Sequence, residues 1–135
     1  MNKIGIFFVA AAAIALSAHS VPAQQAPAPA IKAVLLHNEG VSGVPDREAS
    51  MLQIEFSPGS TTGKHIHPGD EFATVLEGEL QLNVEGQPPR IVKAGDSYHN
   101  SQGVVHETKN LGSVPARTLA VFVVEKGKPV TQPIK

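Results

Sequence analysis

The chain has 135 residues, which is enough for one domain and leaves little room for a second. Its 11 basic and 12 acidic residues give a formal net charge of −1 and are spread along the chain, so no basic patch supports nucleic-acid binding. Cysteine is absent, which excludes disulfides and cysteine-ligated metal sites, and the 12 glycines and 11 prolines favour short strands and turns over a helical bundle.

Residues 1–23 have the pattern of a secretory signal peptide. Lys3 supplies a positive charge, and an unbroken apolar run follows over residues 4–16. Small side chains at the −3 and −1 positions predict cleavage between Ala23 and Gln24, and hence a secreted or periplasmic protein. The alternative is an uncleaved anchor or a buried helix, but a bilayer span needs about 20 apolar residues. We therefore expect no stable membrane insertion after cleavage.

The remainder of the chain predicts a leader, one β domain and a tail. Residues 24–30 are rich in Pro and Ala and are expected to form a flexible leader to a folded domain over residues 31–126. Short apolar runs separated by turn residues predict about nine strands and no helix. They include residues 32–38, 50–56, 64–67, 71–76, 79–84, 90–93, 104–109 and 117–125. This pattern favours an all-β fold, a small jelly-roll barrel. Residues 127–135 are polar and are expected to form a surface tail.

The run over residues 117–125 is apolar on both of its faces. A strand of this kind is expected to be buried on both sides or to lie at a subunit interface, and we therefore predict a homodimer. Three phenylalanines, Phe56, Phe72 and Phe122, are expected to pack inside the barrel.

Three histidines and one glutamate form a candidate metal site. His65 and His67 are two positions apart, so in a strand both imidazoles point to one face with Cα atoms about 6–7 Å apart. The turn at residues 68–70 lets Glu71 return beside the pair, and His106 lies in a later strand that a barrel can bring close. Such a set suits Fe(II), Mn(II), Ni(II), Cu(II) or Zn(II) and leaves positions open for a ligand. The alternative is a surface pair, because a His-x-His pair alone is often accidental.

The spacing of these residues resembles the two signature motifs of the cupins. Residues 59–78 read G-x5-H-x-H-x3-E-x6-G without a mismatch. Residues 95–110 follow G-x5-P-x-G-x2-H-x3-N, except that Ser101 stands at the usual proline. The resemblance implies a jelly-roll β-barrel that holds one divalent metal ion. It also implies four metal ligands: His65, His67, Glu71 and His106.

Three functions are compatible with such a site. The resemblance is to single-domain metal cupins that include dioxygenases, isomerases, lyases and decarboxylases, so the first hypothesis is a dioxygenase-like enzyme for a small organic substrate, with Glu71 as general base. The second is a non-catalytic periplasmic barrel that binds a metal or small ligand. It is favoured because the sequence offers no set of Arg or Lys residues near the histidine pair to orient a substrate, and Lys64 is the one basic residue adjoining it. The third is a structural barrel without metal. His37 and His99 are expected to point outward.

Overall fold

The computed structural model describes residues 30–134, and this part of the chain forms ten strands and no helix. The predicted signal peptide and leader residues 24–29 lie outside the described residues. The strands are β1 (Ile31–Gly40), β2 (Arg47–Phe56), β3 (His65–Ile66), β4 (Gly69–Glu77), β5 (Glu79–Val84), β6 (Arg90–Lys93), β7 (Ser97–Asn100), β8 (His106–Lys109), β9 (Ala116–Glu125) and β10 (Gln132–Pro133). Within residues 30–134, no helix is long and apolar enough to cross a membrane.

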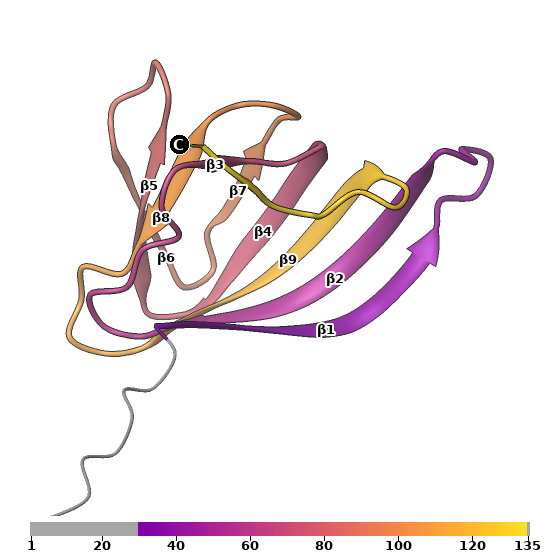
Figure 1. The fold of residues 1–135 in the computed structure, drawn as a ribbon. Coiled ribbons are helices and arrows are strands. Elements are labelled where there is room, and N and C mark those ends of the chain that lie inside the picture. Colours follow the sequence, from indigo (N-terminus) through magenta and orange to yellow (C-terminus); the bar gives the residue numbers. More distant parts are fainter. Residues whose placement is uncertain (1–29, 135) are drawn as a thin grey trace, which may run out of the picture.

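The strands form two five-stranded antiparallel sheets that face one another (Figure 1). The larger sheet has the order β1-β2-β9-β4-β7, and the smaller has the order β10-β3-β8-β5-β6. Neighbours in each sheet are often distant in sequence: β9 lies between β2 and β4, and β8 lies between β3 and β5. This arrangement is the predicted all-β jelly roll.

The core lies between the two sheets, and β9 shows why. Its residues alternate between buried and half-buried along the whole strand, with Ala120, Phe122 and Val124 on the buried face. Strand periodicity therefore places every second side chain of this apolar run in the core. The other face, with Leu119 and Val121, lies on the outer side of the larger sheet and is half-buried.

One of the three phenylalanines is not in the core. Phe56 and Phe122 are buried as predicted, but Phe72 is 50 % exposed. The prediction for Phe72 was wrong because its neighbour Glu71 faces inward, and alternation along β4 then sends Phe72 to the outer face. There its ring stacks on His99, with ring centroids 4.6 Å apart.

Two short strands lie where the sequence predicted none. Strand β7 has the sequence Ser-Tyr-His-Asn, which lacks an alternating apolar pattern, yet it pairs with β4. Strand β10 falls in the segment expected to be a surface tail and pairs with β3, while Val130 packs against the core. Both strands are held by contacts with distant segments, which local patterning does not reveal.

Asn110 stabilises the loop before β9. Its side chain is buried, its Nδ2 donates to Phe56 O at 2.9 Å and Val114 O at 2.8 Å, and its Oδ1 accepts from Gly112 N at 2.9 Å. We expect Asn110→Ala to lower the free energy of unfolding by about 3 kcal/mol, because one buried and two partly buried backbone groups lose their partner. Urea denaturation measures this value.

Asn83→Ala is the matched control, because the Asn83 side chain bonds to two partly buried side chains, those of Gln81 and Glu107. Asn83→Ala should lower the free energy of unfolding by less than about 1 kcal/mol. Equal unfolding midpoints for the two variants would show that the Asn110 bonds do not support the loop.

Candidate metal centre

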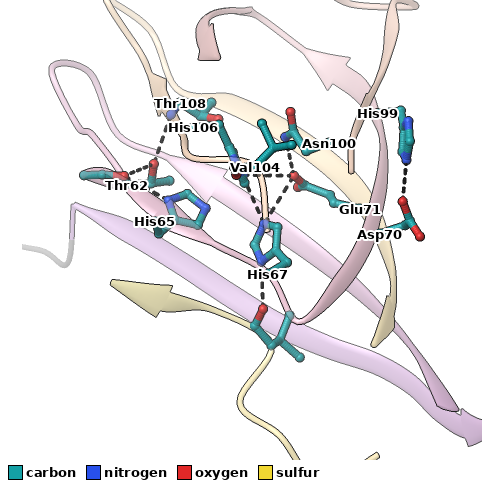
Figure 2. A network of polar contacts seen from close by, with 12 residues as sticks. Thr62, His65, His67, Asp70, Glu71, His99, Asn100, Val104, His106 and Thr108 are labelled. Carbon is teal, nitrogen blue, oxygen red and sulfur yellow. Dashed lines mark hydrogen bonds and ion pairs between the residues drawn. The ribbon is translucent and has the colours of Figure 1, made fainter. Parts of the chain in front are cut away.

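The four predicted ligands come from both sheets and meet in the interior. His65 lies in β3, His67 directly follows it, His106 lies in β8 and Glu71 lies in β4. His65 and His106 occupy paired register positions in the smaller sheet, whereas Glu71 projects inward from the larger one. All four side chains are buried, with residue exposures of 2–6 %. Figure 2 shows these side chains gathered together between the strands.

The nitrogen atoms of these histidines converge on one point. The ligand atoms of His65, His67 and His106 all lie within 4.8 Å of one another. His106 Nε2 is 3.1 Å from His67 Nε2. Glu71 Oε2 is 3.4 Å from His67 Nε2 and 3.5 Å from His106 Nε2. Distances of this size leave the four groups close enough to share a single ion.

The other nitrogen of each ring fixes the tautomer. His65 Nδ1 lies 2.9 Å from Gly63 O, His67 Nδ1 lies 2.7 Å from Val130 O, and His106 Nδ1 lies 2.9 Å from Val104 O. A carbonyl oxygen accepts hydrogen bonds, so each Nδ1 donates its proton and each neutral ring keeps a lone pair on Nε2.

Three lone pairs and a carboxylate therefore face one another in a buried space. Such a donor set repels itself unless a cation lies between its members, and carbonyl-anchored imidazoles are typical of protein metal ligands. The residues thus fit a divalent metal ion. Burial is the main cause that lowers the pKa of His65, which favours the neutral form that binds metal.

Glu71 is held ionised by its neighbours. Asn100 Nδ2 donates to Glu71 Oε2 at 2.7 Å across the β4–β7 pair. Burial by itself would raise the pKa of Glu71, but hydrogen bonds from His106 and His67, in the form that carries a proton on Nε2, and from Asn100 lower the pKa to about 2. A divalent cation bound between these groups would favour the ionised carboxylate in the same way when the Nε2 atoms are unprotonated. Asn100 was not predicted from the sequence, because β7 carries no apolar alternation that would indicate which of its side chains point inside.

Removing the Asn100 amide should weaken the metal site without removing a ligand. We expect Asn100→Ala to lower the affinity for Zn(II) by about 10–100-fold, because Glu71 loses the hydrogen bond that orients it. Competition with a chromophoric chelator measures the affinity. His99→Ala is the control, since the adjacent His99 faces outward and should leave the affinity unchanged. An unchanged Zn(II) affinity in Asn100→Ala would contradict an orienting role.

The remaining histidines of the described residues lie outside this centre. His37 is exposed on β1, and His99 points outward with its Nε2 2.8 Å from Asp70 Oδ1, so both predicted orientations are confirmed. Metal coordination by the four central residues stays a prediction.

A cavity opens directly on the centre. It has a volume of about 280 Å³, and His65, His67 and Glu71 form part of its wall. Tyr98 and Thr108 also line it, and burial raises the pKa of the Tyr98 phenol, which therefore stays protonated. A molecule in this cavity would reach the open side of a bound ion.

Among curated proteins, the chain is 39 % identical over 87 residues to the HTH-type transcriptional regulator PuuR of Escherichia coli, a match that covers 64 % of this chain and 44 % of the regulator. It is 32 % identical over 81 residues to oxalate oxidase GF-3.8 of Triticum aestivum, covering 54 % of this chain and 36 % of that one. The chain thus spans less than half the length of these two relatives.

Solved structures share the fold. A recombinant oxalate oxidase in complex with glycolate superposes with a TM-score of 0.60 at 26 % identity and covers 77 % of this chain and 55 % of that one. The DMSP lyase DddQ of Ruegeria pomeroyi superposes with a TM-score of 0.62 at 23 % identity, covering 76 % and 51 % of the two chains. Residues 52–122 match the cupin domain family, and the chain therefore belongs to the cupins.

Proposed function

We propose that this protein is an exported cupin that binds one divalent metal ion and acts as a dioxygenase-like enzyme on a small organic substrate. The observation that carries the proposal is the convergence of three carbonyl-anchored imidazoles and one carboxylate at the wall of a cavity. Structural metal sites are closed, whereas catalytic sites keep a position open to a ligand. Oxalate oxidases among the relatives and solved structures support an enzymatic role.

The chain's own residues would hold the ion and orient the substrate. His65, His67 and His106 would bind the ion, which would supply Lewis-acid or redox chemistry. Glu71 faces the same cavity and would accept a proton from a substrate hydroxyl as general base, with Asn100 fixing its orientation. The apolar walls exclude water and strengthen these electrostatic interactions.

The test uses protein loaded separately with Fe(II), Mn(II), Ni(II) or Cu(II). Oxygen uptake is followed with enediols, catechols, flavonols and thiols, and turnover in one of these classes is the expected result. His65→Ala should abolish it, while His99→Ala should retain it, since His99 lies on the outer face. Metal uptake without turnover on any class would count against an enzyme.

A non-catalytic module is the second candidate function. It is supported by the similarity to a transcriptional regulator, in which the matching part covers 44 % of the protein. In this case the barrel would bind a metal or small ligand in the periplasm without chemistry. The two candidates differ in one measurement: a bound ligand would be recovered unchanged from the module and converted by the enzyme.

We also propose that a second copy of the chain covers the outer face of the larger sheet. One row of paired positions crosses all five strands of this sheet: His37, Met51, Val121, Phe72 and His99. A two-fold interface places the same patch against itself, and the uncharged centre of this row brings no like charges together. Light scattering should give a dimer for the native chain and a monomer for Phe72→Glu. A native monomer at micromolar concentration would contradict the proposal.

Export is proposed from the signal pattern of residues 1–23. N-terminal sequencing of protein recovered from a periplasmic fraction should begin at Gln24. A full-length chain retained in the membrane fraction would contradict cleavage.

A further inference from the structure

The cavity beside the metal centre is walled by apolar side chains. Ile31 comes from β1, Leu52, Ile54 and Phe56 come from β2, and Phe122 comes from β9. Ala33 also lines the cavity and is itself exposed, so it lies where the cavity meets solvent. Among the described residues that line this cavity, none is a lysine or an arginine.

This lining limits the charge that a ligand can carry. Three neutral imidazoles and the Glu71 carboxylate have a combined charge of −1, so a divalent ion raises the charge of the centre to +1. One negative charge on a ligand is therefore compensated. A second would be buried without a partner, which costs several kcal/mol.

The cavity also limits the size of a ligand. A cavity of about 150 Å³ accommodates a benzene molecule. The volume here is about 280 Å³, which accommodates one substituted ring with its oxygen atoms. The three rings of a flavonol would extend past Ala33 into solvent, where the protein offers no enclosing wall.

The polar groups at the inner end of the cavity suit phenolic or enolic oxygens. Tyr98 and Thr108 both line it, and their side chains share a hydrogen bond. Both are uncharged hydroxyl groups, which donate and accept hydrogen bonds with a hydroxyl or enolate oxygen but do not neutralise a carboxylate.

We infer that the ligand of this centre is a single-ring or similarly sized molecule with an apolar body and two adjacent oxygens that carry one negative charge in total, such as a catechol or an enediol. A small dicarboxylate such as oxalate is disfavoured. The inference rests on the proposed metal site and narrows the proposed substrate to one chemical class.

Direct binding to Zn(II)-loaded protein tests the inference, because this ion does not undergo redox turnover. Isothermal titration calorimetry compares catechol with oxalate, and we expect catechol to bind at least 10-fold more tightly. Ala33→Phe should fill the mouth of the cavity and weaken catechol binding at least 10-fold without changing the Zn(II) affinity. Val34→Phe is the control, since the neighbouring side chain lies on the opposite face of β1.

The possible failures can be distinguished. If the protein takes up Zn(II) but binds oxalate as tightly as catechol, this inference is overturned and the proposed metal site stands. The inference is also overturned, and the proposed metal site also stands, if Ala33→Phe and Val34→Phe weaken catechol binding equally. If neither Zn(II), Mn(II) nor Ni(II) binds to the native chain, the proposed function and this inference both fail.

Discussion

Replacing His106 with alanine should lower the affinity for Zn(II) by more than about 100-fold, because loss of a group that merely orients a ligand already costs 10–100-fold. His106 is central to the site: its Nε2 lies 3.1 Å from His67 Nε2 and 3.5 Å from Glu71 Oε2. It is also the one histidine ligand supplied by β8, so no neighbour in sequence can replace it.

The effect should appear in thermal unfolding as well as in direct binding. A metal ion present at 100 times its Kd stabilises the native chain by about 2.7 kcal/mol, so EDTA should lower the Tm of the native protein. His106→Ala should unfold at the same temperature with and without EDTA. His99→Ala is the control, because this exposed histidine bonds to Asp70 on the outer face and should retain the response to EDTA. A native Tm that is insensitive to EDTA would instead indicate a structural barrel without metal.

Replacing Gly69 with alanine should destabilise the fold by about 3 kcal/mol or more, at the upper end of the cost of overpacking. A Cβ atom at Gly69 would lie 2.0 Å from Val123 O and 2.6 Å from Val124 Cα. Both are backbone atoms of β9, which cannot rotate away as a side chain can. Strand β4 would therefore have to separate from β9 at the position where Gly69 pairs with Val124.

This separation should also disturb the metal centre, because Glu71 follows Gly69 by two residues on the same face of β4. We expect a lower urea midpoint and a weaker Zn(II) affinity in Gly69→Ala. Gly40→Ala is the matched control, because a Cβ atom at Gly40, at the end of β1, would meet nothing within 4 Å. The free energy of unfolding of this variant should therefore change by no more than about 0.5 kcal/mol. Equal urea midpoints for the two variants would show that the close packing of β4 on β9 does not require a glycine at position 69.

Most of the strands follow from local patterns in the sequence. The alternation in residues 50–56 and 117–125 matches β2 and β9. The glycine that ends the first motif, Gly78, and the glycine that begins the second, Gly95, have positive φ angles of 73° and 94°. These features depend on near neighbours in the chain, which is why periodicity and turn chemistry reveal them. Strands β7 and β10 were not predicted because they are short and are held by pairing with distant strands.

The sequence by itself determined the residue types and spacings of the candidate site: two histidines that share a strand face, a glutamate after a turn and a later histidine. The tertiary structure decided which groups surround them. It brought Asn100 onto Glu71 and Val130 O onto His67 Nδ1, placed Phe72 outside, and left Ile31, Ile54 and Phe122 as the walls of one cavity. The bond between His67 and Val130 alone joins positions 63 residues apart. Chain positions that distant meet only through the order of strands in the two sheets, which local periodicity does not specify.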